Sequence, residues 1–198
     1  MKLRRGLLIV DVQNDFCPGG KLAVSEGDKI IPLCNKYIKL FSQNKLPIFL
    51  TRDWHPKKTK HFKSFGGIWP AHCIQNTLGA EFHKGLKFPK ESIILSKGMD
   101  PEKDSYSVFQ SRDTNGTEFP ILLALLGIKE LFIAGLTIDY CVKSSVLDAL
   151  AAKLKMFVLA DAVKGVNLKP DDSQHAIEEM VTRGATILTL DKVEKILK

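Results

Sequence analysis

The segment from Thr51 to Cys73 gathers side chains that commonly bind metal ions. Its sequence, TRDWHPKKTKHFKSFGGIWPAHC, holds three of the five histidines of the chain and an aspartate two residues before the first of them. Carboxylate and imidazole ligands together suit zinc, iron or manganese. A single loop histidine is usually structural, but three with an aspartate in one segment favour a metal site. The candidate ligands are Asp53, His55, His61 and His72.

Three other reactive side chains lie far from this segment in the sequence. Cys141 stands in GLTIDYCVKSS, where a strand is expected to turn into a helix capped by Asp139. The first turn of a helix favours a thiolate, through its free N–H groups and the helix dipole. Asp11 and Lys97 each end an apolar run, LLIVD and SIILSK. Each residue alone has an ordinary structural explanation, but together they form a candidate catalytic set of cysteine, lysine and proton-transferring aspartate.

The elements that would position these residues alternate along the chain. Nearly continuous apolar runs are typical of strands buried on both faces, and segments with one apolar face are typical of helices. The expected strands are Leu7–Val12, Leu46–Thr51, Ser92–Ser96, Glu130–Leu136, Lys155–Ala160 and Ala185–Leu190. The expected helices are 30–41, Phe119–Leu126, Asp139–Lys153 and Asp171–Arg183, the last two opening with acidic capping residues.

This alternation predicts a single α/β domain spanning residues 1–198, with three layers, α/β/α, around a six-stranded parallel sheet. Asp11 ends the first strand, Lys97 follows the third, and Cys141 begins the helix after the fourth. In open α/β sheets, ligands bind outside the carboxyl ends of the strands. The reactive side chains are therefore expected to converge at one edge of the sheet, as they would in an enzyme.

Composition excludes several other classes of protein. The net charge is +7, but the lysines are spread from Lys2 to Lys198, so no nucleic-acid partner is expected. The run GLLIV is shorter than the core of a signal peptide, and no run approaches the roughly 20 apolar residues of a membrane span. The four cysteines form no CxxC pair. We expect a cytoplasmic protein with reduced thiols and no membrane partner.

Five motifs extend this interpretation to a family. In order, DVQNDFCPGG, RDWHP, WPAHC, KGMDPEKDSYSVF and GLTIDYCV resemble the motifs of nicotinamidases (pyrazinamidases), a branch of the isochorismatase-like cysteine hydrolases, over about residues 6–190. The resemblance implies hydrolysis of nicotinamide to nicotinate and ammonia through a cysteine thioester, as in NAD salvage. It places Asp11, Lys97 and Cys141 on catalytic positions. It places Asp53, His55 and His72 on metal-ligand positions, with His61 as the expected fourth ligand.

The resemblance also implies how the substrate is held. One divalent metal ion, zinc before iron or manganese, would bind the pyridine nitrogen while the cysteine attacks the amide. Phe16 and Trp69 correspond to ring-packing residues, and Tyr140 is expected to line the pocket. The backbone N–H groups of Thr137 and Cys141 would hold the oxyanion, next to a cis peptide before Thr137. The remaining histidines, His83 and His175, are assigned to structure or solvent.

Other functions stay open at this point. Another small-amide hydrolase of the same superfamily would keep the cysteine set without needing a ring-binding metal. A basic binding module with a structural metal loop would bind nucleic acid in a salt-dependent way and hydrolyse nothing. A metallohydrolase would use metal-bound water as the nucleophile. The isochorismate-cleaving branch does not use the cysteine and is disfavoured by Cys141. A homo-oligomer is compatible with the sequence, which does not decide the oligomeric state.

Overall fold

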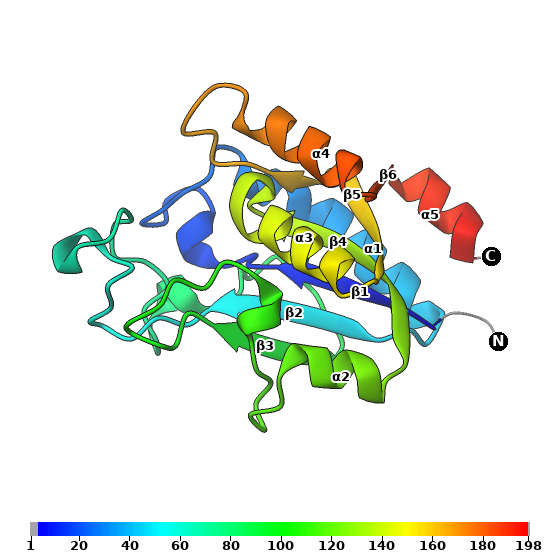
Figure 1. Cartoon of the computed structure of the whole chain (residues 1–198), viewed down its shortest axis with the longest axis horizontal. Helices are drawn as coiled ribbons and strands as arrows, with labels where there is room; N and C mark the ends of the chain where they lie inside the picture. Colours follow the sequence, from blue (N-terminus) through cyan, green and yellow to red (C-terminus); the bar gives the residue numbers. More distant parts are fainter. Residues whose placement is uncertain (1–3, 198) are drawn as a thin grey trace.

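Six strands form one parallel sheet in the order β3-β2-β1-β4-β5-β6 (Figure 1). The computed structural model describes residues 4–197. The strands are β1 (Arg4–Val10), β2 (Ile48–Asp53), β3 (Ile93–Lys97), β4 (Ile128–Leu136), β5 (Lys155–Lys164) and β6 (Thr186–Leu188). All neighbouring pairs are parallel. The strand order reverses between β1 and β4, and in such sheets the ligand site lies at this switch point.

Helices cover both faces of the sheet, which confirms the predicted three-layer α/β/α fold in a single domain (Figure 1). They are α1 (Ile31–Gln43), α2 (Phe119–Leu125), α3 (Lys143–Ala151), α4 (Asp172–Thr182) and α5 (Leu190–Leu197). Helices α1 and α5 contribute to the core on one face, and α2, α3 and α4 to the core on the other. In β1, Leu7 and Ile9 belong to one core and Leu8 and Val10 to the other, so this part of the strand is apolar on both faces.

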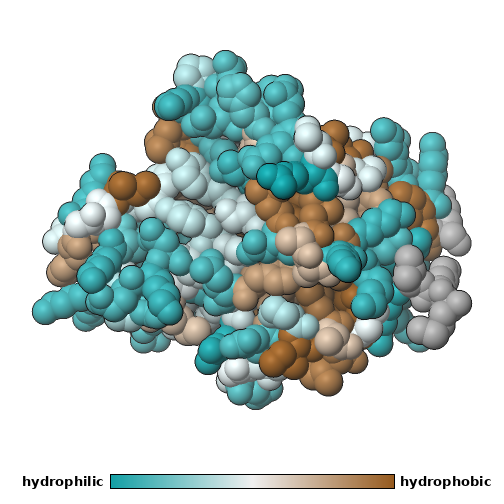
Figure 2. All heavy atoms as spheres, viewed as in Figure 1, coloured by the Kyte–Doolittle hydropathy of each residue, from teal (hydrophilic) through white to brown (hydrophobic). Residues whose placement is uncertain are grey.

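The face of the molecule seen in Figure 2 is largely hydrophilic, and one of its groups of apolar side chains lies over α2. Ile121 and Leu125 of this helix are 49% and 74% exposed. Within residues 4–197, no helix combines the length and the apolar character needed to cross a bilayer.

The carboxyl-terminal prediction was partly wrong. The expected strand Ala185–Leu190 is shorter, because β6 ends at Leu188 and the unpredicted helix α5 begins at Leu190. Residues 190–197, LDKVEKIL, place Leu190, Val193 and Leu197 at helical spacing, and all three pack against the core on the α1 side. The expected strand therefore overlaps α5 at Leu190, and the apolar residues from there onward have the period of a helix.

The segment after β4 also differs from the prediction. A π-helical turn, Ile138–Val142, precedes α3, which begins only at Lys143. Asp139 is not a helix cap: its carboxylate accepts hydrogen bonds from the backbone N–H groups of Val166 (3.1 Å) and Asn167 (2.7 Å). Asp139 thus ties the turn to the loop after β5. The other expected cap, Asp171, makes no side-chain capping hydrogen bond either.

Candidate active site

A buried lysine joins the three residues of the expected catalytic set. The ammonium of Lys97, at the end of β3, lies 2.9 Å from Asp11 Oδ2 and 3.5 Å from Cys141 Sγ. It also donates a hydrogen bond to Asp53 Oδ1, at the end of β2. Lys97 is fully buried and Cys141 is 7% exposed. Parallel strands thus bring the side chains together at one edge of the sheet, as the sequence predicts.

Asp11 is held in place by its neighbour on β2. Thr51 donates from Oγ1 to Asp11 Oδ1 at 2.7 Å, and the Asp11 backbone N–H bonds back to Thr51. The φ angle of Asp11 is +49°, a left-handed conformation that costs free energy in residues other than glycine. Among the described residues, the buried Asp11 Oδ2 accepts no hydrogen bond of good geometry. The Lys97 ammonium, at 2.9 Å, is the close partner of this oxygen, which can accept a proton from a group that approaches it.

Burial and charge act in opposite directions on the ionisation of this cluster. Burial raises the pKa of the Cys141 thiol well above its usual value, and the nearby Lys97 ammonium opposes this. Burial also raises the pKa of Asp11, against the lowering effect of Lys97. Burial thus opposes the thiolate that the position of Cys141 favours. A neighbouring base would assist removal of the thiol proton during attack, and an oxygen of Asp11 lies within 4.8 Å of the sulfur.

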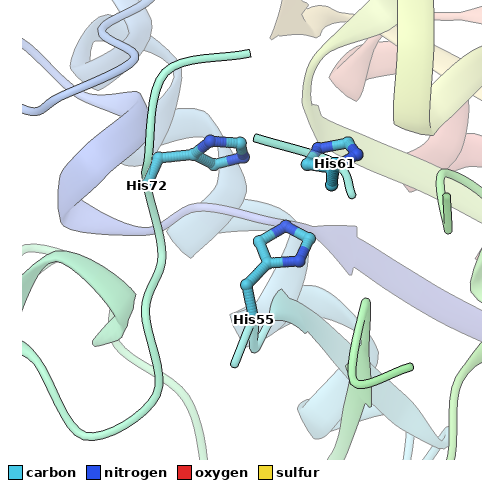
Figure 3. A group of neighbouring side chains, drawn as sticks. All are labelled: His55, His61 and His72. Atoms are coloured by element: carbon cyan, nitrogen blue, oxygen red, sulfur yellow. The ribbon is translucent and has the colours of Figure 1, made fainter. Parts of the chain in front are cut away.

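Three histidines converge near this cluster (Figure 3). Each of His55, His61 and His72 offers a ring nitrogen, and these three atoms lie within 4.8 Å of one another. Asp53 completes the group, because its Oδ2 lies 3.7 Å from His55 Nε2 and 3.9 Å from His72 Nε2. All four side chains are buried. The structure thus brings the four predicted ligands together, with Asp53 shared between them and Lys97.

In each of these histidines, a hydrogen bond at Nδ1 leaves the other ring nitrogen, Nε2, available to bind a metal ion. The Nδ1 atoms of His55 and His72 lie 3.0 Å and 2.8 Å from backbone carbonyl oxygens, and that of His61 lies 2.5 Å from a carboxylate oxygen of Asp104. Because these oxygens only accept, Nδ1 must donate and Nε2 keeps its lone pair. Burial lowers the pKa of His72 to about 4 and also lowers that of His61. Neutral imidazoles of this kind fit a metal ion.

One cavity connects the thiol to the histidines. Its volume is about 370 Å³ including its opening to solvent. Cys141, Thr137, His61 and His72 are in its wall. The predicted ring-packing residues Phe16 and Trp69 and the predicted pocket residue Tyr140 line it too. The cavity is thus apolar over much of its wall, with a nucleophile and imidazole nitrogens converging on it.

Comparisons with known proteins agree with this site. The sequence model of the isochorismatase domain matches residues 5–192. The chain belongs to the isochorismatase family. It is 40% identical over 202 residues to a nicotinamidase of Escherichia coli, covering 94% of this chain and 95% of that protein.

Solved structures show the same relationship for this isochorismatase-family chain. The pyrazinamidase of Pyrococcus horikoshii in complex with zinc superposes with a TM-score of 0.88 at 44% identity, covering 94% of this chain and 99% of that one. PnC1 of L. infantum in complex with nicotinate superposes with a TM-score of 0.85 at 30% identity, covering 96% of this chain and 95% of that one.

Three supporting residues were not singled out from the sequence. Gln13 bonds the backbone of Asp53 in both directions at 2.8 Å, which fixes the end of β2. Asp104 bonds His61 as described above, and Tyr106 accepts from Trp69 Nε1 at 2.9 Å in the cavity wall. All three lie inside motifs that carry the family resemblance, DVQNDFCPGG and KGMDPEKDSYSVF. Their motif positions were visible, but their partners depend on the fold.

Residues outside the cluster have ordinary environments. His83 accepts a hydrogen bond from the Gly85 N–H at 3.1 Å, and His175 is exposed on α4. Neither residue lines the cavity. Cys17 and Cys73, both inside family motifs, are buried, and burial raises the pKa of both thiols, that of Cys17 to about 11.

Proposed function

We propose that this isochorismatase-family chain is a nicotinamidase, which hydrolyses nicotinamide, and also pyrazinamide, to the carboxylic acid and ammonia. The observation that carries the proposal is one small cavity with Cys141 in its wall beside a converging histidine triad. A thiol suits attack on an amide carbon, and the triad suits a ring nitrogen held by a metal. Relatives named nicotinamidase and pyrazinamidase over almost their full length support the same activity.

The thiol performs the bond-breaking step in this proposal. Asp11 takes the proton of Cys141 as Sγ attacks the carboxamide carbon, and gives it to the departing ammonia, which leaves a thioester. Asp11 then removes a proton from water, which attacks the thioester to release the acid and restore the thiol. Lys97, 2.9 Å from Asp11 and 3.5 Å from the sulfur, stabilises the negative charge as it moves between these groups.

Backbone donors are assigned to the oxyanion. We assign the N–H groups of Thr137, which precedes the π-helical turn after β4, and of Cys141, which lies within it, to the carbonyl oxygen of the substrate. The peptide bond between Leu136 and Thr137 is cis, as expected. One such donor typically lowers the barrier by about 3 kcal/mol. Because these donors belong to the backbone, the side chain at Thr137 does not change them.

The ring of the substrate is assigned to the other half of the cavity. Asp53, His55, His61 and His72 would hold one divalent metal ion, zinc in first place, whose Lewis acidity supplies a contact for the pyridine nitrogen. Phe16, Trp69 and Tyr140 enclose the ring, and Trp69 meets Tyr140 edge to face at 5.0 Å between ring centroids. This enclosure excludes water and sets the amide carbon near the sulfur.

Ammonia release from nicotinamide tests the proposal. We expect activity in the wild type, a loss of at least about a thousandfold in Cys141→Ala, and a raised KM after removal of metal by a chelator. Full activity of Cys141→Ala together with loss on chelation would show that metal-bound water is the nucleophile. Absence of ammonia release by the metal-loaded wild type, with release from other small amides, would assign the chain to a different amidase.

The proposal extends to the location and the partners of the protein. We propose a cytoplasmic location with a small-molecule substrate and no nucleic-acid or membrane partner. Four free, buried cysteines within the described chain support a reducing compartment. Gel filtration at two salt concentrations, with and without nucleic acid, measures the oligomeric state and tests the absence of such binding.

A further inference from the structure

The three histidines of the triad are supported in two different ways. His55 and His72 direct Nδ1 at the backbone carbonyl oxygens of Gly98 and Pro70. His61 instead directs Nδ1 at a side chain, the carboxylate of Asp104, at 2.5 Å. The His61 side chain is 5% exposed, whereas that of Asp104 is 60% exposed. The orientation of one buried ring thus depends on an exposed side chain.

The backbone around the first two histidines is fixed by pairing within the same loop. The N–H of His55 donates to Cys73 at 3.0 Å, and the N–H of Gln75 donates back to His55 at 2.9 Å, so the segments that carry His55 and His72 form a short parallel bridge. The end of β2 that precedes them is anchored by Gln13. These two ligands would keep their places without Asp104.

The segment that carries His61 is held by a separate loop, residues 98–106. The Lys60 N–H donates to the Pro101 carbonyl at 2.8 Å, and Thr59 Oγ1 donates to the same oxygen at 3.2 Å. Lys60 also forms an ion pair with Glu102 at 2.5 Å, with both side chains more than 60% exposed. We call these contacts of Thr59 and Lys60 with Pro101 and Glu102 the clasp. The clasp holds the two loops together, but it does not reach the His61 ring, which Asp104 contacts.

We propose that Asp104 is a positioning residue that makes His61 a metal ligand, by fixing its ring orientation and its Nε2 tautomer; this inference rests on the proposed function. A neutral imidazole without a partner divides its proton between the two nitrogens and rotates about its side-chain bonds. A carboxylate at Nδ1 removes both freedoms and raises the basicity of the ligating nitrogen. Loss of such a partner typically lowers metal affinity by about 10- to 100-fold.

Zinc affinity of the full-length protein, measured by competition with a chromophoric chelator in the absence of substrate, tests this role. We expect Asp104→Asn to weaken zinc binding about 10-fold or more. Asp104→Glu should restore part of the loss. Glu102→Gln is the matched control, since it removes a charge from the same loop and from the same clasp without touching His61, and it should change the affinity less than about twofold.

A double-mutant cycle separates this role from a general effect of the loop. In a His61→Ala background, Asp104→Asn should cause no further loss of zinc affinity. An equal loss in both backgrounds, or an unchanged affinity in the wild-type background, would overturn the proposal. Because Asp104 is largely exposed, the thermal midpoint of the metal-free variant should match that of the wild type, which shows that the protein is folded.

The same measurements distinguish this inference from the proposed function. If the wild type binds zinc and Asp104→Asn binds it more weakly, the positioning role stands whatever amide the enzyme hydrolyses. If zinc affinity is unchanged in Asp104→Asn while the wild type releases ammonia from nicotinamide, the role of Asp104 is wrong and the proposed function stands. At saturating zinc, the variant should recover most of the kcat, because Asp104 does not line the cavity and contacts it only through His61.

Discussion

Replacing Lys97 by methionine tests how the catalytic cluster is held together. The substitution keeps most of the length of the buried side chain and removes the charge between two carboxylates. Oxygens of Asp11 and Asp53 lie within 4.8 Å of each other, so two negative charges would repel by about 3 kcal/mol at an effective dielectric constant of about 20. Removing one partner of a buried ion pair usually costs about 3–5 kcal/mol. We expect a loss of stability in this range and a loss of amide hydrolysis.

Urea denaturation at pH 7 in the presence of a chelator measures this loss, because a bound cation would offset the missing charge. Lys97→Met combined with Asp11→Asn is the decisive comparison, since it removes one of the two repelling carboxylates. The double variant should be more stable than Lys97→Met by about 3 kcal/mol, although Asp11→Asn alone should destabilise the protein. Either of two results would show that repulsion does not govern the cluster. One is a free energy of unfolding of Lys97→Met within about 1 kcal/mol of wild type. The other is strict additivity of the two substitutions in the free energy of unfolding of the double variant.

Three further changes have defined outcomes. Gly98→Ala should weaken zinc binding and cost about 1–3 kcal/mol on urea denaturation, because Gly98 has φ +68° and a methyl group there would overlap the His55 imidazole. Glu130→Gln should cost about 2 kcal/mol at pH 7. Burial alone would raise the Glu130 pKa, but the hydrogen bond from Arg5 at 2.7 Å outweighs this and lowers it, so the difference from wild type should be present above the unfolded-state pKa and vanish as the pH falls through the folded one. Trp69→Phe should lower kcat/KM about fivefold through KM, since it removes the hydrogen bond to Tyr106.

The sheet and the convergence of the reactive residues could be predicted, because both follow from the pattern of apolar and polar residues within short segments of the sequence. A buried parallel strand reads as a continuous apolar run, and the residue that ends it must lie at the carboxyl edge. This placed Asp11, Lys97 and Cys141 together although they are far apart in sequence. Where one element follows another without a break, as α5 follows β6, the same rule extended the strand to Leu190 and missed the helix that begins there.

The pairings that orient the site could not be predicted. His61 and Asp104 are 43 residues apart in two loops without regular structure, so neither spacing nor periodicity connects them. The balance of effects on the Cys141 thiol could not be predicted for a related reason. Its position after a strand indicates free N–H groups, but the pKa of the thiol is set mainly by burial, which depends on every segment packed over it.

Asp53 links the two halves of the site. Its Oδ1 accepts from Lys97, while its Oδ2 faces His55 and His72. Although burial would raise the pKa of Asp53, the Lys97 ammonium opposes this and the pKa lies well below its usual value, so this carboxylate stays ionised. A cation bound at Oδ2 would draw its charge away from Lys97, which would then act more strongly on Asp11 and Cys141. Metal removal should therefore alter both substrate binding and the reactivity of the thiol, and the rate of Cys141 alkylation with and without zinc measures the second effect.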